Sequence, residues 1–251
     1  MPRTALVTGA TAGFGAAIAR RLLDAGYTVA GTGRRAARLD AQAADWGPAF
    51  VPLCFDLRDA AAAAAAWARL PPAFDRLDVL VNNAGLALGI GPADAARLDD
   101  WHTMIDTNVR ALVTTTHQLL PRLLAAGGGH IVNIGSVAGR HAYPGGNVYG
   151  ATKAFVDQFS ANLRADLLPH GTRVTTIAPG LAETEFSLVR FGGDATRAAA
   201  VYAGTDPLLA QDIAEAVDWA LRQPPRVNIN HIEIMAGCQA MAGFQIRRRG
   251  G

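Results

Sequence analysis

The residues whose types and spacing could perform chemistry centre on Tyr149 and Lys153, the latter the only lysine among 23 basic residues. On a helix, side chains four positions apart share a face and are about 6 Å apart along the axis. Tyrosine has an ordinary pKa of about 10, so acting as a base near neutral pH needs roughly 3 to 4 kcal/mol of preferential phenolate stabilisation. A nearby ammonium can supply this, whereas the rigid guanidinium of arginine would spread the charge. We therefore predict that this pair transfers a proton to or from a hydroxyl or carbonyl oxygen.

A third polar residue, Ser136, precedes Tyr149 by thirteen positions and could hold the oxygen of a substrate. Taken alone, each feature has an ordinary structural explanation. A Tyr-x-x-x-Lys pair on a helix is often a packing contact, and a serine after a strand is usually a cap or turn residue. Their occurrence together with the glycine turn described next favours the chemical interpretation.

A glycine-rich turn, "TGATAGFG" from Thr8 to Gly15, directly follows the first apolar run of the chain. Glycines at positions 9, 13 and 15 allow the backbone to turn tightly and to approach a pyrophosphate. The helix that starts here would stabilise the phosphate charge through its N-terminal N–H groups. Its position between a strand and a helix favours a dinucleotide site over a purely structural turn.

Seven short β-branched or apolar runs are predicted to be the strands that position these residues. They cover Thr4–Thr8, Thr28–Thr32, Ala49–Cys54, Asp78–Asn82, His130–Gly135, Arg173–Ala178 and Val227–Ile234. Between them lie segments of helical period, including residues 15–26, 34–47, 99–127 and 148–168, and an alanine run from Ala60 to Ala66. Strands alternating with helices predict an α/β, single-domain, Rossmann-like doubly wound fold: a seven-stranded parallel sheet with helices on both faces.

In its motifs the chain resembles the short-chain dehydrogenase/reductase family. The marks are Thr-Gly-x-x-x-Gly-x-Gly at Thr8–Gly15, "NNAG" at Asn82–Gly85, "PG" at Pro179–Gly180 and Tyr149-x-x-x-Lys153, in the family's order. The resemblance implies one NADP-binding domain over residues 1–251 and a catalytic set of Asn108, Ser136, Tyr149 and Lys153. It also implies that Asn108 positions a water connecting Lys153 to solvent, and that Lys153 binds the nicotinamide ribose.

The cofactor residues that the resemblance implies come from several strand ends. Among them, Asp56 would contact the adenine, although an N-cap or turn role is an alternative for this residue. Asn82 would lie against the adenosine half, while its neighbour Asn83 could instead stabilise the central strand. The full set is Thr8, Gly9, Thr11, Ala12, Gly13, Phe14, Gly15, Arg34, Arg35, Asp56, Leu57, Asn82, Ala84, Gly85, Tyr149, Lys153, Pro179, Gly180 and Thr184.

The end of the second strand favours NADP over NAD. NAD-selective sites usually carry an acidic residue there, but the sequence reads Gly33, Arg34, Arg35. A guanidinium offers planar, bidentate donors to a phosphate, so Arg34 and Arg35 are predicted to bind the 2′-phosphate. The alternative is a solvated helix start, which is less favourable because the helix dipole disfavours arginine in a first turn.

Longer stretches, among them "GGNVYGATKAFV" and "PGLAETEFSLVRF", resemble the NADP-dependent 3-hydroxy acid dehydrogenases of the family. This implies small 3-hydroxy acid substrates such as serine, L-allo-threonine and 3-hydroxypropionate. One alternative is another carbonyl reductase of the same fold, acting on acyl-thioesters, sugars or hydrophobic ketones. A non-catalytic NADP-sensing protein is the other, but it would be expected to lack one of the four catalytic residues.

A weakly patterned segment, residues 181–206, is predicted to be a substrate lid. The carboxylate of a hydroxy acid needs a cationic partner, for which Arg190 in this segment is the first candidate and Arg140 the second. Either could instead be a surface arginine. Ser136, Tyr149 and His141 are the other expected substrate contacts, and Thr184 and Glu183 are further lid residues that could contribute.

Composition excludes several other classes of protein. A net charge of +2 gives no broad footprint for nucleic acid or an anionic membrane, and no apolar run approaches the roughly 20 residues of a membrane span. The two cysteines, Cys54 and Cys238, are too few for a disulfide framework or a multi-cysteine metal site and are expected to be buried free thiols. With no signal peptide at the N-terminus, we expect a cytoplasmic protein without a metal.

The C-terminal part of the chain leaves two questions open. The family resemblance implies a homotetramer, and the apolar segment "IMAGCQAMAGFQI" could cover a neighbouring subunit or fold back on its own sheet. The basic run Arg247–Arg249 is expected to be a solvated tail.

Overall fold

The computed structural model of the protein describes residues 3–240, which contain a seven-stranded parallel sheet. Its order is β3-β2-β1-β4-β5-β6-β7, so the chain starts in the middle and winds outward to each edge in turn. The strands are β1 (Thr4–Val7), β2 (Thr28–Gly33), β3 (Phe50–Cys54), β4 (Val79–Asn82), β5 (His130–Ile134), β6 (Arg173–Pro179) and β7 (His231–Ile234).

Apolar side chains of the central strands point alternately to the two faces of the sheet and form two separate apolar cores. Val79 and Val81 of β4 join one buried cluster, whereas Leu80 between them joins the other. Because successive side chains of a strand point to opposite faces, both faces of the sheet are covered by apolar residues. Such strands are stable only between two layers of helices.

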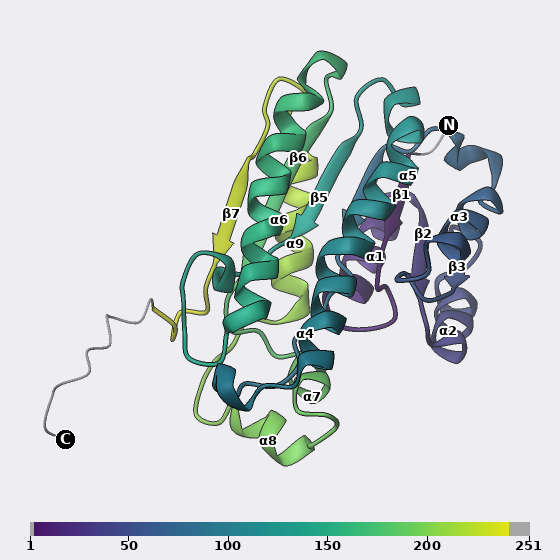
Figure 1. Cartoon of the computed structure of the whole chain (residues 1–251). Coiled ribbons are helices and arrows are strands. Elements are labelled where there is room, and N and C mark those ends of the chain that lie inside the picture. The colour runs from purple at the N-terminus through teal and green to yellow at the C-terminus, as the bar shows by residue number, and fades with distance from the viewer. Residues whose placement is uncertain (1–2, 241–251) are drawn as a thin grey trace, which may run out of the picture.

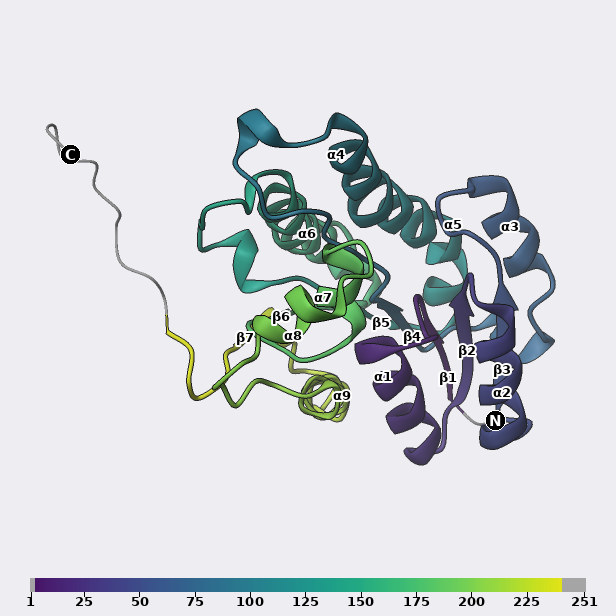
Figure 2. The ribbon, with the colours of Figure 1, turned by 90° about the horizontal axis from the view of Figure 1, so that it is seen from below.

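The helices form those two layers (Figure 2). α1 (Gly13–Asp24), α2 (Ala36–Trp46) and α9 (Ala210–Leu221) contribute to the first cluster, and α3 (Ala60–Ala68), α5 (Ala111–Ala125) and α6 (Asn147–Asp166) to the second. α4 (Leu98–Ile105) leads into α5 through a π-helical turn, Asp106–Arg110. The predicted fold class is therefore confirmed, and the long helix expected over residues 99–127 is interrupted by this turn.

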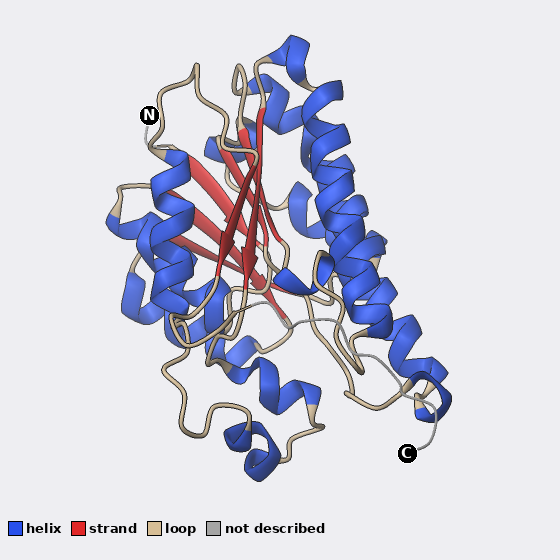
Figure 3. Cartoon of the chain, turned by 90° about the vertical axis from the view of Figure 1, so that its left-hand side faces the viewer, coloured by secondary structure: helices blue, strands red, loops and turns tan. Residues whose placement is uncertain are grey.

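The lid segment leaves the sheet at the carboxyl end of β6 (Figures 1 and 3). It contains two short helices, α7 (Glu185–Arg190) and α8 (Ala195–Ala200). Its two ends pair with each other, because Leu208 N donates to Leu181 O at 3.0 Å and Glu183 N donates to Leu208 O at 2.8 Å. The segment is thus a loop whose two ends lie side by side and which covers the carboxyl ends of the strands.

Several sequence predictions are corrected or lie outside the described residues. Both Cys54 and Cys238 are exposed, because Cys54 ends the edge strand β3 and Cys238 follows β7. The seventh strand starts only at His231. The tail Arg247–Arg249 and the last part of the apolar segment after Ile234 lie beyond the described residues. No helix within residues 3–240 is long and apolar enough to cross a membrane.

Candidate active site

A cavity of about 330 Å³ opens at the carboxyl ends of the strands. It runs from the glycine turn after β1, past Arg34 after β2, to Tyr149 and Lys153 on α6. Parallel strands bring their carboxyl ends to one edge, and ligands of doubly wound folds bind there. The two halves of the site predicted from sequence are therefore parts of one cavity.

The glycine turn has the geometry of a phosphate cradle. Gly9 and Gly13 have φ angles of +70° and +51°, in the region that favours glycine. A Cβ atom on Gly15 would lie only 2.2 Å from the carbonyl oxygen of Gly9. α1 starts at Gly13 without a side-chain cap, so its first N–H groups are available to an anion.

Arg34 and Arg35, predicted together as phosphate ligands, have different surroundings. Both line the cavity, but Arg35 is engaged: it donates to Thr11 Oγ1 at 3.1 and 2.8 Å and pairs with Glu185 of the lid at 2.7 Å. Arg38, one turn along α2, pairs with the same carboxylate at 2.7 Å. Arg34 has no such pairing within residues 3–240, so it is the guanidinium more available to a phosphate.

Asp56, the expected adenine contact, lines the cavity and pairs with Arg58 at 2.6 Å. The hydrogen bond from Arg58 lowers the pKa of this carboxyl, and the charge of Arg34 acts in the same direction. Asp56 is therefore an ionised acceptor at the outer end of the cavity. Its backbone neighbour Leu57 also lines the wall.

Two residues of the predicted cofactor set have their side chains in the core instead. Asn82 is 3% exposed and donates to Thr116 and Asn133 at 3.0 and 2.8 Å, so its side chain joins β4 to β5 and α5. Its neighbour Asn83, which directly follows β4, donates from its side chain to Thr8 O at 2.8 Å and Gly9 O at 3.3 Å, so it fastens the glycine turn to the sheet where it borders the cavity. The hydroxyl of Thr8 accepts from the N–H groups of Asn83 and Ala84 and fixes the turn from behind.

The remaining predicted residues divide between the cavity and its surroundings. Thr11, Ala12, Phe14, Ala84, Gly85 and Thr184 line it. Pro179 and Gly180 do not: Pro179 accepts from Ser136 at 3.4 Å, and Gly180 donates to Ile234 at 2.7 Å. His141 turns away to Glu233, 3.1 Å distant, and Arg140 pairs with Asp157 at 3.1 Å. Neither lines this cavity, because carboxylates of β7 and α6 hold them outside it.

Tyr149 lies at the inner end of the cavity and is 8% exposed. Burial raises its pKa to about 12, while a hydrogen bond with the Ser136 hydroxyl and the charge of Arg190 act in the opposite direction. The lowering by Lys153 expected from the sequence is not found. The ammonium lies 5.9 Å from the centre of the Tyr149 ring and donates to Ile134 O at 2.8 Å. Burial is therefore the main influence on the pKa of the phenol.

Asn108 lies close to Lys153, whose side chain lines the cavity. A Cβ atom on Gly85 would lie 3.4 Å from Lys153 Nζ and 3.3 Å from Asn108 Oδ1, so both atoms border the same small space. Asn108 lies in the π-helical turn and donates to Leu86 O and Thr152 Oγ1 at 2.8 and 3.0 Å. Its oxygen accepts from Leu86 N at 2.9 Å, so the backbone of Leu86 and the hydroxyl of Thr152 fix both ends of the amide.

Residues of the segment 181–206 lie at this end, where Phe186 and Val189 line the cavity. The ring of Phe186 lies 5.6 Å from that of Tyr149, centre to centre. Arg190 places its guanidinium 5.9 Å from the centre of the Tyr149 ring. Gly89 O and the Tyr143 hydroxyl, at 3.0 and 3.1 Å, hold this guanidinium in place. A fixed cation thus borders the phenol that could transfer a proton.

Sequence reasoning missed Glu185 and Tyr143. Glu183 was the expected lid acid, but it is exposed, and it is Glu185, at the start of α7, that reaches α2. The local signal was the N-cap Thr184, which marks where α7 starts and so which side chains face inward. No local pattern marks Tyr143, which is 47 residues from Arg190.

Comparison with known proteins shows the family of the chain. Residues 3–190 match the family model described as short chain dehydrogenase. The chain is 52% identical over 248 residues to serine 3-dehydrogenase of Agrobacterium fabrum, with 99% of each chain covered. It is also 52% identical to the NADP-dependent 3-hydroxy acid dehydrogenase YdfG of Salmonella typhi, with 97% of this chain and 98% of the relative covered.

Among solved structures, the fold is similar to the closed form of serine dehydrogenase complexed with NADP⁺. The TM-score is 0.96 at 49% identity, and 98% of this chain and 100% of that one are covered. Similarity of this extent includes the lid as well as the sheet.

Proposed function

The chain belongs to the short-chain dehydrogenase family as an NADP-dependent dehydrogenase, and from this premise we propose that it interconverts the 3-hydroxyl and 3-oxo forms of small 3-hydroxy acids. Serine, L-allo-threonine and 3-hydroxypropionate are the proposed substrates. The proposal treats residues 1–251 as one NADP-binding domain in which residues 181–206 form the substrate lid.

The cavity fits NADP in two respects. Gly9 and Gly13 have positive φ angles and a Cβ on Gly15 would collide with Gly9 O, so this tight turn requires glycine, and the uncapped start of α1 suits a pyrophosphate. Arg34 is the proposed ligand of the 2′-phosphate, with Arg35 beside it. When bound, NADP supplies the acceptor of hydride from the alcohol carbon and, when reduced, its donor.

The proposed proton transfer uses residues at the inner end. Ser136 holds the substrate oxygen, and Tyr149 exchanges a proton with it. The raised pKa of Tyr149 keeps the phenol protonated at neutral pH, which is the form that donates a proton to a carbonyl oxygen in the reductive direction. Lys153 stabilises the phenolate that results, and Asn108 and the space beside Gly85 connect the ammonium to solvent.

One observation carries the substrate class: the Arg190 guanidinium beside the Tyr149 ring. The Tyr143 hydroxyl and Gly89 O hold it from behind, which leaves further N–H groups for a substrate anion. A carboxylate bound there would place the adjacent carbons of a short hydroxy acid near Tyr149. A neutral ketone or sugar would leave this guanidinium without an anionic partner, because Gly89 O and the Tyr143 hydroxyl carry no charge.

Substrate pairs that differ only in charge test the proposal. With NADP⁺ we expect turnover of serine, L-allo-threonine, 3-hydroxypropionate and 3-hydroxyisobutyrate, and a much lower kcat/KM for 1,3-propanediol. Turnover of the diol or of a hydrophobic alcohol equal to that of the acids would instead favour a general carbonyl reductase. Turnover of 2-hydroxyethanesulfonate, measured in the same assay, tests whether a sulfonate can replace the carboxylate.

Substitution of the arginine makes the same test within the protein. Arg190→Ala is expected to raise the KM for 3-hydroxypropionate at least 10-fold, since loss of a charge-assisted hydrogen bond costs about 1.5 to 3 kcal/mol. The KM for NADP⁺ should change little. Arg197→Ala, which removes another lid arginine stacked on Phe191, is the matched control. Equal KM values for the acid in the Arg190 variant and the parent would remove Arg190 from the site.

We further propose a homotetramer, as the family resemblance implies. Leu98 and Ile105 of α4 and Phe155 of α6 are exposed apolar side chains on two neighbouring helices, which a second subunit could cover. Light scattering after size exclusion measures the mass directly, and a 26.2 kDa particle would contradict the proposal.

A further inference from the structure

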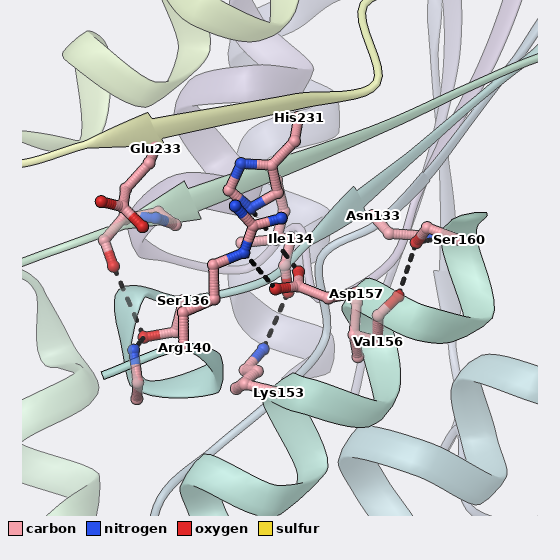
Figure 4. Close-up of polar contacts among 12 residues, drawn as sticks. Asn133, Ile134, Ser136, Arg140, Lys153, Val156, Asp157, Ser160, His231 and Glu233 are labelled. Atoms are coloured by element: carbon pink, nitrogen blue, oxygen red, sulfur yellow. Dashed lines mark hydrogen bonds and ion pairs between the residues drawn. The ribbon is translucent and has the colours of Figure 1, made fainter. Parts of the chain in front are cut away.

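A group of charged residues outside the cavity lies directly behind the proton-transfer residues (Figure 4). Its centre is Asp157 on α6, whose side chain is 14% exposed. Figure 4 shows the guanidinium of Arg140 and the imidazole of His231 close together on one side of its carboxylate. Asp157 Oδ2 pairs with Arg140 Nε at 3.1 Å, and Oδ1 lies 3.7 Å from His231 Nε2. The proton transfer proposed above does not involve this carboxylate.

Asp157 is held close to Lys153 by two features of the backbone. The two residues are four apart on α6, hence on one helix face and about 6 Å apart along its axis. Across from them lies the peptide of Ile134 and Gly135: Ile134 O accepts from Lys153 at 2.8 Å, and a Cβ atom on Gly135 would lie 3.2 Å from Asp157 Oδ1. Gly135 therefore allows the carboxylate to reach the strand end that holds the ammonium.

Asp157 Oδ1 is buried and accepts no hydrogen bond within the described residues. Because an ionised oxygen in a medium of low polarity exerts a strong field, its charge is felt by cations nearby. Arg140 pairs with the other oxygen, so Oδ1 is the oxygen that faces the strand end at Gly135. We propose that Asp157 is a positioning residue of the proton-transfer site, which stabilises Lys153 in its ammonium form from behind.

The electrostatics of Lys153 agree with this placement. Burial lowers the pKa of Lys153 to about 8, and the charge of Asp157 opposes that shift. Without the carboxylate, a larger fraction of Lys153 would be neutral near pH 8 and would not stabilise a phenolate. The inference rests on the proposed function, in which Lys153 acts as a cation beside Tyr149.

Other titratable groups also face this region. Tyr149 lies on the same helix, and Arg140 follows the 3-10 turn Val137–Gly139. From β7 come His231 and Glu233, the latter paired with His141 at 3.1 Å. Burial lowers the pKa of His231, so this ring is neutral near pH 8 and leaves Asp157 as the charge that Lys153 meets.

The single lysine of the sequence permits a direct test. Full-length protein without added lysines, grown with ¹³Cε-labelled lysine, gives one side-chain signal, whose titration by NMR reports Lys153 alone. We expect a midpoint near 8 in the parent. Asp157→Asn should lower that midpoint by about one pH unit. Asp157→Glu, which keeps the charge, should restore it, and Asp166→Asn, an exposed carboxylate on the same helix, should have no effect.

Arg140→Gln distinguishes an effect of the Asp157 charge on Lys153 from a structural effect of losing the ion pair between Arg140 and Asp157. It breaks the same ion pair as Asp157→Asn but leaves the carboxylate uncompensated, so the midpoint should stay or rise. A purely structural role predicts the same change in both variants. An unchanged midpoint in Asp157→Asn, or an equal fall in both, would overturn the inference. If Asp157→Asn does not fold, as judged by circular dichroism, a fall in Arg140→Gln would overturn it instead.

The titration needs no substrate, so its result is independent of whether hydroxy acids are turned over. Where turnover is measured, the alkaline limb of the kcat profile should move to lower pH in Asp157→Asn, by the amount found in the titration. A lowered midpoint in a chain that oxidises none of the tested acids would retain the inference and reject the proposed substrate class.

Discussion

Replacing Glu185 by glutamine tests whether the lid is fastened to the cofactor side of the cavity. The Glu185 carboxylate bridges Arg35 and Arg38 at 2.7 Å each, across the start of α2. The hydrogen bond from Arg35, with that from Arg38, lowers the pKa of Glu185, so it is ionised at neutral pH. Glutamine retains the size of the side chain and removes the charge.

The expected magnitude is modest, because the side chains are 38 to 46% exposed and solvent screens them. Exposed ion pairs contribute about 0.2 to 1 kcal/mol each, so two pairs on one carboxylate contribute about 1 kcal/mol together. That is about a fivefold shift in the equilibrium between closed and open lid. Since α7 also carries Phe186 and Arg190, we expect the KM for a hydroxy acid to rise about fivefold in Glu185→Gln, with a smaller change in kcat.

Steady-state kinetics with NADP⁺ and 3-hydroxypropionate at two salt concentrations provide the assay. Salt screens the parent's ion pairs, so the difference between parent and Glu185→Gln should shrink between 0.05 and about 1 M KCl. Glu183→Gln, an exposed carboxylate two residues earlier, is the control and should behave as the parent. Adding Arg38→Gln to Glu185→Gln should have little further effect. Unchanged KM at low salt, or an equal effect of Glu183→Gln, would refute the lid attachment.

Three other substitutions probe the site and the core. Lys153→Arg should lose most of kcat with little change in thermal stability, because a guanidinium cannot replace the compact ammonium; near-normal turnover would contradict the role of this lysine. Gly15→Ala places a Cβ 2.2 Å from Gly9 O, so NADP⁺ affinity measured by calorimetry should fall at least 10-fold, and retained affinity would mean that the turn does not hold the phosphate. Burial lowers the pKa of His130 to about 3, so below pH 6.5 the unfolded chain binds a proton that the folded chain does not. The free energy of unfolding should therefore decrease by about 1.4 kcal/mol for each unit that the pH is lowered from 6.5 to 3. Urea unfolding of His130→Gln should show a correspondingly flatter pH dependence than the parent, and equal slopes would exclude His130 as the cause.

The order of the elements follows from local rules that act over a few residues. Alternation such as Val79, Leu80, Val81 determines which face each side chain takes, and glycines at 9, 13 and 15 allow the tight turn. The spacing of Tyr149 and Lys153 places them on one helix face in any fold that keeps the helix. Hence the sequence alone predicted the class of fold, the seven strands and the position of the candidate site.

Tertiary structure decided which side chains meet across long separations. Asn82 and Asn83 look equivalent in sequence, but in the fold Asn82 bonds to Asn133 of β5 within the core, whereas Asn83 bonds to Thr8 O at the glycine turn and borders the cavity. The attachment of Glu185 joins residues 150 apart. Burial, which no local pattern reports, reverses the expected direction of the Tyr149 pKa.

The carboxylate of Asp157 shows that sequence spacing does not reveal the surroundings of a side chain even within a single helix. Its spacing from Lys153 was visible in the sequence, but its significance depends on Arg140, His231 and the strand end at Gly135. These groups come together only when the sheet and α6 pack. The sequence by itself predicted the pair of Tyr149 and Lys153. The charges that surround the pair were decided by packing, because the field at a buried atom depends on distance in space and not along the chain.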